Sequence, residues 1–508
     1  MGLLRPDTIV LNWLLALQFF AALCVELFPR LSLGAHAERE AESLRRGPFL
    51  LGALASLMGL ALTIALIPQT LGGTPVSADY WWTRDLYHLR FQADVLSTPL
   101  VAVLCALGLL IHLNLAGQPL VSQPHRRAAL LLVAQGCAIG CCLGADLILV
   151  CFFLQLLVLC LWLLLRLDAP AAADVMLSVT YSGAALVLAS AMLIWSRVSE
   201  ASTAPLPMLL LPVEPSQLGW MAVLALLGAL PLLACYPANG WLLQAAEQSP
   251  AAVLAPALLL PVVGAHLLLR LLPGSMTMAL LPGLGTAAFL LGALTLWWGA
   301  IRAWLTMSLR HLAAWLTVSQ AGMLLLAVSA ATAPTSPPEV IRAAALQLLA
   351  APPALLAVWL GSVGIRSATG TDSIPDLGGL LRTSPVAAIA LLLGGLSLAG
   401  VPPLPGFQVQ RLLVGQLTNS GAWGSVAAIL GADLIVAVAV LDALRRLLPQ
   451  KAPAPSVRWS SPWLSVSLVL GVVALLAVAL APAALANWSR QALYWGLSSA
   501  RGGVFLPR

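Results

Sequence analysis

The chain has 508 residues, of which 60% are hydrophobic and only 9% are charged, and its formal net charge is +6. Soluble domains carry about 25% charged residues, so this composition indicates an integral membrane protein and leaves no room for a large soluble domain. The basic excess does not call for a nucleic-acid partner, because basic residues at membrane ends meet anionic lipid.

Apolar runs of about 20 residues recur along the whole chain, and each is long enough to cross a hydrocarbon core of about 30 Å. We predict an all-α polytopic membrane protein with about 14 transmembrane helices. The first helix is expected to be retained rather than cleaved as a signal peptide, because it keeps Asn12 and Glu26 and no small-residue cleavage motif follows it. In chain order the predicted spans are 8–28, 48–70, 97–117, 127–145, 147–166, 174–196, 217–237, 250–271, 278–300, 305–331, 341–365, 385–418, 421–446 and 461–484.

The longest polar connections are predicted at 29–47, 71–96 and 366–384. The second contains ADYWWTRDLYHLRFQAD, residues 78–94, which is rich in aromatic side chains and alternates in polarity. This pattern favours either an interfacial hairpin or an aromatic belt at the membrane surface.

The distribution of lysine and arginine predicts the orientation, because these residues are enriched in cytoplasmic loops. The odd-numbered connections between spans hold 15 of the 25 basic residues, and the termini and even-numbered connections hold the other 10. Both termini are therefore expected to face away from the cytoplasm, with connections 29–47 and 447–460 on the cytoplasmic side.

All eight cysteines fall within predicted spans, where thiols usually act as small apolar packing residues. Cys137, Cys141 and Cys142 form a C-x-x-x-C-C cluster, but iron–sulfur clusters and structural zinc need other spacings. We therefore expect packing here and no metal site. The sequence also lacks a glycine-rich phosphate loop, an H-E-x-x-H motif and a nucleophile elbow, so nothing indicates a self-contained enzyme.

Two predicted spans contain prolines at their centres. The stretch LLGALPLLACYPANGWLLQ, residues 226–244, holds Pro231 and Pro237, and GGLSLAGVPPLPGFQVQRLL, residues 394–413, holds a second group: Pro402, Pro403 and Pro405. Proline breaks a helix, and a broken membrane helix must line a cavity that is enclosed by protein or filled with water.

Breaks at corresponding places in two halves indicate inverted repeats. Here the halves are spans 4–8 and 9–13, with the breaks in spans 7 and 12. The alternative is that the prolines only kink two packed helices. The repeat interpretation divides the chain into N-terminal helices with an interfacial loop at 1–126, a first five-helix repeat at 127–272, a second at 273–447, and a C-terminal helix and tail at 448–508.

The stretch TDSIPDLGGLLRTSPVAAIALLLGGLSLAGVPPLPGF, Thr371 to Phe407, resembles the D-x-x-D-L-G-G-L … L-A-G-x-P-P-x-x-G-F signature of one membrane family. This family comprises the antiporter-like subunits of respiratory complex I, photosynthetic type I NAD(P)H dehydrogenase and Mrp sodium/proton antiporters. SLRHLAAWLTVSQAGMLLLAVS, Ser308 to Ser329, resembles the family's D-L-K-R-L-L-A-Y-S-S-I-S-Q-M-G helix. FQADVLSTPLVAVL and GCCLGADLILVCFFLQLLVLCLWLLL are similar to its D-G-L-S and A-D-D-L … F-W-E-L segments. The resemblance covers nearly the whole chain at low identity.

The resemblance implies proton translocation along a central axis of buried lysines, glutamates and histidines. Such residues cost about 2.5–3.5 kcal/mol each at the bilayer centre, so they usually mark ion paths. The positions that match this axis instead hold Gln155, Leu232 or a neighbour, Val262, Gln347, Gln410 and Arg411. Glutamine releases no proton at physiological pH, and Leu or Val carries none, so we expect impaired conduction.

Our candidates for a proton path, in chain order, are Asp146, Gln155, His266, Arg310, His311, Arg411 and Asp433. His266 is the strongest relay candidate because imidazole titrates near neutrality, although it is also suited to hydrogen-bonding a neighbouring helix. Asp146 is suited to capping a helix as well as to transport. Arg310 and His311 match the family's polar K-R pair and fit either a hydrated channel or the anchor of a helix start.

At the far end of the chain, Asp442 with Arg445 and Arg446 is interpreted as a charge cluster at the cytoplasmic end of a helix. Asp433 lies deeper in the same span. We expect Arg411 either to pair with a buried acid such as Asp433 or to reach the membrane interface.

The resemblance implies a membrane-arm subunit of a proton-translocating NAD(P)H:quinone oxidoreductase. The alternatives are a subunit of an Mrp-type cation/proton antiporter and a structural paralogue that conducts nothing. In each case we expect a non-catalytic chain with no cofactor or metal of its own, lipid and other membrane subunits as partners, and no nucleic acid. The expected location is a bacterial inner membrane or a thylakoid membrane.

Overall fold

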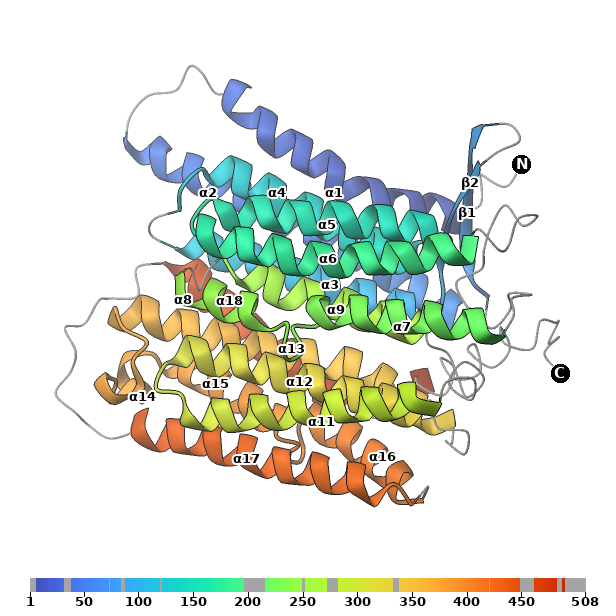
Figure 1. Ribbon diagram of the computed structural model, residues 1–508. Helices are drawn as coiled ribbons and strands as arrows, with labels where there is room; N and C mark the ends of the chain where they lie inside the picture. The colour runs from blue at the N-terminus through green and yellow to red at the C-terminus, as the bar shows by residue number, and fades with distance from the viewer. Residues whose placement is uncertain are drawn as a thin grey trace.

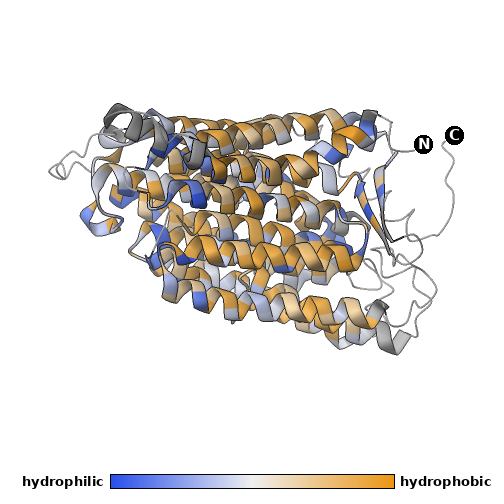
Figure 2. Cartoon of the chain, turned by 90° about the horizontal axis from the view of Figure 1, so that it is seen from above, coloured by the Kyte–Doolittle hydropathy of each residue, from blue (hydrophilic) through white to orange (hydrophobic). Residues whose placement is uncertain are grey.

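The computed structural model describes residues 6–31, 38–72, 74–83, 87–118, 121–195, 215–248, 252–271, 282–331, 338–419, 421–447, 461–481 and 487–488. Its long helices lie side by side and run in nearly the same direction across the molecule (Figure 1). Apolar residues dominate the lengths of the helices, whereas many of the hydrophilic residues gather at the helix ends (Figure 2). This pattern is that of a bundle that crosses a lipid bilayer.

The N-terminal part contains three helices and a hairpin: α1 (Pro6–Leu31), α2 (Glu38–Leu71), β1 (Val76–Thr83), β2 (Tyr87–Ala93) and α3 (Ser97–Gly117). The expected connection 29–47 is wrong in its second part, because α2 begins at Glu38. The segment from Glu38 to Arg46 is rich in Glu, Ala, Leu and Arg, which favour helix even where the chain leaves the apolar layer.

The hairpin predicted for residues 78–94 is confirmed, whereas its place at the membrane surface stays a prediction. β1 and β2 pair antiparallel from Val76 opposite Ala93 to Thr83 opposite Tyr87. The Tyr80 hydroxyl donates a hydrogen bond to Asn12 Oδ1 of α1, and burial raises the pKa of Tyr80.

The next helices form two sets. The first set is α4 (Pro124–Leu143), α5 (Leu147–Arg166), α6 (Pro170–Trp195), α7 (Pro215–Leu232), α8 (Gly240–Gln248) and α9 (Leu254–Leu271). The second is α11 (Pro282–Leu305), α12 (Leu309–Ala331), α13 (Pro338–Thr369), α15 (Pro385–Leu398), α16 (Pro405–Asn419) and α17 (Trp423–Leu447), with η3 (Ile374–Asp376) and α14 (Leu380–Thr383) between α13 and α15. Helix α18 (Pro462–Leu480) follows and packs on α3 and α13.

Among the described residues, twelve helices are long and apolar enough to cross a membrane, and the apolar segments Gly219–Leu232 and Pro385–Leu398 are shorter. These two shorter segments begin the predicted broken spans. The all-α membrane fold with two interrupted helices is therefore confirmed, whereas the number of crossings stays a prediction.

The two sets repeat one order of contacts. α4 packs on α5, α5 on α6 and α6 on α7, as α11 packs on α12, α12 on α13 and α13 on α15. Each set also has a short strand-like latch before its second helix, where Phe91 pairs with Gly144 and Ser308 pairs with Ser373. The hairpin and α14 mark opposite ends of the bundle in Figure 1, so α5 and α12 start at opposite ends.

Glycine allows the closest helix crossings. A Cβ placed on Gly183 or Gly228 would lie 2.6 Å from the carbonyl oxygen of the other glycine, between α6 and α7. At Gly322 of α12 a Cβ would lie 2.3 Å from the Leu296 backbone nitrogen of α11. Small residues at such crossings let membrane helices gain van der Waals contact, since lipid gives no hydrophobic drive between them.

Candidate functional site at the seam of the two halves

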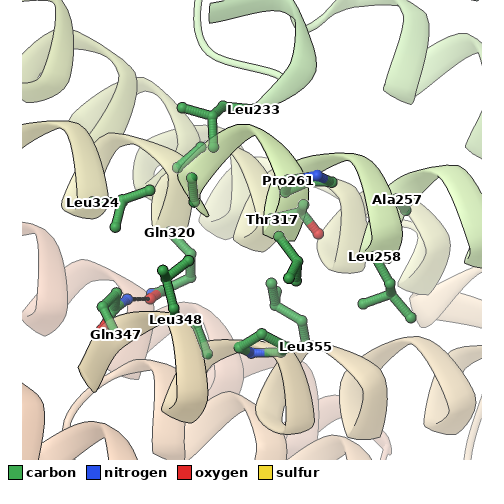
Figure 3. Close-up of a pocket in the computed structure, with 15 residues that line it drawn as sticks. Leu233, Ala257, Leu258, Pro261, Thr317, Gln320, Leu324, Gln347, Leu348 and Leu355 are labelled. Carbon is green, nitrogen blue, oxygen red and sulfur yellow. Dashed lines mark hydrogen bonds between the residues drawn. The ribbon is translucent and has the colours of Figure 1, made fainter. Parts of the chain in front are cut away.

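A cavity of about 50 Å³ lies where the two helix sets meet. Helix α9 of the first set packs here against α12 and α13 of the second. Figure 3 shows Ala257, Leu258 and Pro261 facing Thr317, Gln320 and Gln347 across it. None of the fifteen described residues that line the cavity is ionisable.

The polar groups of the cavity are engaged with one another. Gln347 Nε2 of α13 donates to Gln320 Oε1 of α12 at 2.6 Å, as the dashed line in Figure 3 marks. Thr317 accepts a hydrogen bond from Trp359 Nε1 at 3.1 Å and donates to the Ala313 carbonyl at 2.9 Å. A water molecule needs about 10–15 Å³ of such space and two to four polar partners, so this largely apolar cavity offers water little.

The hydrogen-bonded series of glutamine side chains continues into the second helix break. Gln320 Nε2 donates to the Leu398 carbonyl at 3.3 Å, and Gln410 Nε2 donates to the same carbonyl at 3.2 Å. Leu398 is the last residue of α15, and its carbonyl loses its helical donor because Pro402 has no N–H. Three buried glutamines thus link α12, α13, α15 and α16 and satisfy a backbone group that the prolines leave free.

Two glycines make this closure possible. Gly400 has a φ of +70°, a conformation that costs other residues strain, and a Cβ there would lie 1.3 Å from Gln410 Oε1. Gly406 passes so close to the end of α15 that a Cβ would lie 1.7 Å from the Ser397 carbonyl oxygen. Its N–H donates to Ser397 Oγ at 3.3 Å. The Leu-Ala-Gly-Val-Pro-Pro-Leu-Pro-Gly stretch is therefore a compact turn around the Gln410 amide.

The first break is closed in a similar way. The fully buried Trp241, in α8, donates its Nε1–H to the Pro231 carbonyl of α7 at 3.1 Å. The Cys235 N–H returns to the Leu230 carbonyl at 2.9 Å. In both halves a side chain from the segment after the break satisfies a carbonyl before it.

The structure places several residues that match the family's relay around this seam. Val262 and Gln347 line the cavity, and Gln410 is joined to it through Leu398 and Gln320. Leu232 packs against Gly264 of α9, and its neighbour Leu233 lines the cavity. Gln155 lies on α5 with both amide atoms buried and without a hydrogen-bond partner among the described residues.

His266 belongs to a second buried cluster, towards the hairpin. It is 1% exposed on α9, next to the Cys142 backbone, and its Nδ1 has no hydrogen-bond partner among the described residues. One turn later, Arg270 Nη2 lies 2.5 Å from Asp94 Oδ2, with both residues buried. The other Asp94 oxygen accepts the N–H groups of Leu96 and Ser97 at the start of α3.

Sequence reasoning missed this ion pair. Asp94 stands in the segment that is similar to D-G-L-S, but nothing local links it to Arg270, which lies 176 residues further along the chain. The available signal was the presence of an acid and an arginine at the ends of two predicted membrane helices, since buried charges in lipid normally pair.

The remaining candidates do not converge on one site. Asp146 stands at the N-cap position of α5 but makes no capping hydrogen bond with its side chain; its Oδ2 instead accepts the N–H of Arg90 from the hairpin at 3.0 Å. Arg310 Nε lies 2.6 Å from Asp372 Oδ2, and its Nη1 donates to the Glu247 carbonyl at 2.5 Å. These contacts anchor helix starts.

His311 faces a separate cavity beside Arg310. Asp433 is buried on α17 and Arg411 is exposed on α16, and the ion pairs of the described residues do not include one between them. Asp442 pairs with Arg445 at 3.5 Å and Arg446 at 2.8 Å, which is the charge cluster that the sequence predicts at this helix end.

Comparison with known proteins agrees with this geometry. Over 456 residues the chain is 24% identical to NADH-quinone oxidoreductase subunit N of Desulforudis audaxviator, covering 88% of each chain. It is 28% identical over 279 residues to formate hydrogenlyase subunit 3 of Escherichia coli, covering 52% of this chain and 44% of that one.

Solved structures share the fold over almost the whole chain. A chain of respiratory complex I from Thermus thermophilus with bound NADH superposes with a TM-score of 0.80 at 20% identity, over 97% of this chain and 99% of that one. A chain of the Mrp complex from Dietzia sp. gives a TM-score of 0.74 at 18% identity, over 96% and 98%. The family described as NADH:quinone oxidoreductase/Mrp antiporter, transmembrane, matches residues 144–435, so the chain belongs to this family.

Proposed function

We propose that this chain is a membrane-arm subunit of a complex I-like, proton-translocating NAD(P)H:quinone oxidoreductase in a bacterial inner membrane. In that assembly it supports its membrane neighbours and relays no protons along its own seam. Family membership and a relative named NADH-quinone oxidoreductase subunit N, matched over 88% of both chains, support the assembly. The absence of an ionisable residue among the described residues of the central cavity supports the structural role.

The chemistry of the seam carries this proposal. A relay needs groups that accept and release protons near neutral pH, whereas a glutamine amide offers fixed donors and an acceptor. The Gln347 amide donates to Gln320, and the amides of Gln320 and Gln410 both donate to the Leu398 carbonyl. Among its described residues, the seam therefore keeps the polar contacts that stabilise a broken helix in lipid and has no side chain that could carry a proton through the cavity.

The outer faces suit a partner-bound subunit. Large apolar side chains are exposed on several helices, including Trp13, Phe20, Trp220 and Leu434, each at least half exposed. Such surfaces meet lipid or other membrane helices. We expect mild-detergent purification to bring other membrane subunits along, and a monodisperse single chain as the native form would contradict this expectation.

Proton stoichiometry of the purified assembly in proteoliposomes tests the role of the seam. A double variant, His266→Gln with Asp433→Asn, removes two buried ionisable candidates while keeping a polar side chain of similar size at each position. We expect the number of protons moved per electron pair to stay at the parental value. Asp442→Asn, on an already paired acid at a helix end, is the matched control for the carboxyl change. A lower ratio in the double variant, with intact assembly, would contradict the proposal.

One observation favours a conducting role instead. His266 is buried with an unpartnered Nδ1, among the described residues, beside the Asp94–Arg270 pair, which makes it a candidate proton-holding site off the glutamine axis. The single variant His266→Gln decides between the two functions: loss of proton movement with unchanged quinone reduction would assign the relay to this cluster. Sodium-dependent proton exchange without an electron donor would point to an Mrp-type assembly.

A further inference from the structure

A second cavity, of about 330 Å³, opens at the end of the bundle where α8, α11 and α12 meet. It lies outside the seam and outside the Asp94 cluster. Its lining includes Leu243, Arg302, Leu305, Thr306, His311 and Trp315. Its lining thus combines a guanidinium, an imidazole and a hydroxyl with an apolar wall.

Arg302 is positioned by aromatic rings. Its guanidinium carbon lies 5.2 Å from the ring centroid of the buried Trp315 and 6.0 Å from that of Trp298. No ion pair of Arg302 occurs within the described part of the chain. A cation held over two indole rings keeps its N–H donors free for a further ligand, and arginine is well suited to phosphate.

Of the carboxylates near this cavity, the buried Asp372 is neutralised. Asp372 is held by Arg310 at 2.6 Å and by Arg366 at 3.6 Å, and it accepts the Ser308 hydroxyl at 2.7 Å. Glu247 is exposed and acts on His311 electrostatically.

Further along the same end, Arg446 contacts Met307, a lining residue, at 3.7 Å, and it also pairs with Asp442. Around the connection between α11 and α12, the described side chains thus include five arginines (Arg302, Arg310, Arg366, Arg445 and Arg446) and four carboxylates (Glu247, Asp372, Asp376 and Asp442). The local charge therefore favours an anion.

The cavity borders a lipid-facing surface. Along α11, Trp297, Trp298 and Trp304 are 36%, 40% and 48% exposed, and Leu305 is 57% exposed. Tryptophan is enriched where membrane helices meet the headgroup layer. A free anion would use the cationic pocket alone, whereas an anionic phospholipid would use both the pocket and this apolar face.

We propose that this cavity binds the phosphate of an anionic phospholipid. Arg302 and His311 contact the phosphate, the Thr306 hydroxyl donates to it, and the acyl chains lie along the exposed tryptophans of α11. The connection between α11 and α12 is predicted to be cytoplasmic, where the leaflet is rich in anionic lipid. This inference does not rest on the proposed function, because it concerns the outer surface.

The test measures lipid bound to the purified membrane complex. Parental and Arg302→Gln complexes are delipidated in mild detergent and titrated with phosphatidylglycerol or phosphatidylcholine, with native mass spectrometry counting the lipid retained. Each basic residue near a membrane surface contributes about 1 kcal/mol, so Arg302→Gln should weaken phosphatidylglycerol binding about fivefold. Arg166→Gln, an exposed arginine over the Trp162 ring at the end of α5, is the matched control and should change little.

Two outcomes would overturn the proposal. Equal phosphatidylglycerol retention by the parental and Arg302→Gln complexes would remove Arg302 from any lipid site. Competition by inorganic phosphate as effective as that of phosphatidylglycerol would identify a site for the free anion. If Arg302→Gln does not assemble, Arg302→Lys and the parental preference for phosphatidylglycerol over phosphatidylcholine give the answer, and no preference for the anionic lipid would refute it.

Discussion

Replacing Gln320 and Gln410 by methionine, singly and together, tests the glutamine closure of the second break. Methionine matches glutamine in length and lacks the amide, so the cavity volume changes little. Each single variant leaves the Leu398 carbonyl with one donor, because both amides bond to the same oxygen. Gln410→Met should therefore cost only one net hydrogen bond, about 0.5–1.5 kcal/mol.

The double variant is expected to cost more than the sum of the two single variants. It leaves a buried backbone carbonyl without a partner, which adds a desolvation penalty of about 1–3 kcal/mol. Gln320→Met also removes the acceptor of the Gln347 amide, so it should destabilise the protein more than Gln410→Met does. The coupling energy between the two positions should thus be unfavourable and of the order of 1–2 kcal/mol.

Equilibrium unfolding of the complex in mixed detergent micelles measures the stability changes. Hydrogen–deuterium exchange of the peptide that covers residues 395–406 gives a local reading, because this peptide should open first in the double variant. Additive effects, or exchange in this peptide that does not rise, would refute the idea that the two amides share one carbonyl.

Other parts of the fold can be tested in the same preparation. Gly400→Ala should prevent assembly or lower the unfolding midpoint, because alanine in the left-handed conformation costs about 1–2 kcal/mol and its Cβ would clash with Gln410. A native gel that shows parental assembly would contradict this expectation. Asp94→Asn should destabilise the chain by about 3–5 kcal/mol, because it leaves the buried Arg270 without its carboxylate partner. Asp79→Asn, in an exposed ion pair, should cost less than about 1 kcal/mol in the same unfolding assay. Cysteines engineered into connections 29–47 and 447–460 should react with an impermeant thiol reagent only from the cytoplasmic side, and labelling from opposite sides would mean that a span was miscounted.

Much of the fold could be predicted from the sequence because lipid imposes strong rules. Apolar runs located the helices, and Pro231, Pro402 and Pro403 located both interruptions. The prediction failed at the start of α2, where hydropathy ends but helix propensity continues. It also missed α8 as a separate short helix, because a segment of nine residues carries little periodicity.

The sequence predicted several residues of the site but not the contacts between them. The resemblance pointed to Val262, Gln347 and Gln410, and the structure places the first two on one cavity and links the third to it. Gln320 was missed as part of the chain of amides, although it lies in the quoted segment Ser308–Ser329, because its role depends on a carbonyl 78 residues away. Partners at such distances in the chain leave no local pattern in a single sequence.

The two strand-like latches set an order of events during synthesis. In the first half, Phe91 is already made when Gly144 emerges, so the start of α5 can lock onto the hairpin at once. In the second half, Ser308 must wait until α13 has been made and Ser373 follows it. The first half can therefore mature as it leaves the ribosome, whereas α12 stays without its latch until the next helix is inserted. An insertion machinery that shelters α12 during this interval would matter more for the second half of the chain than for the first.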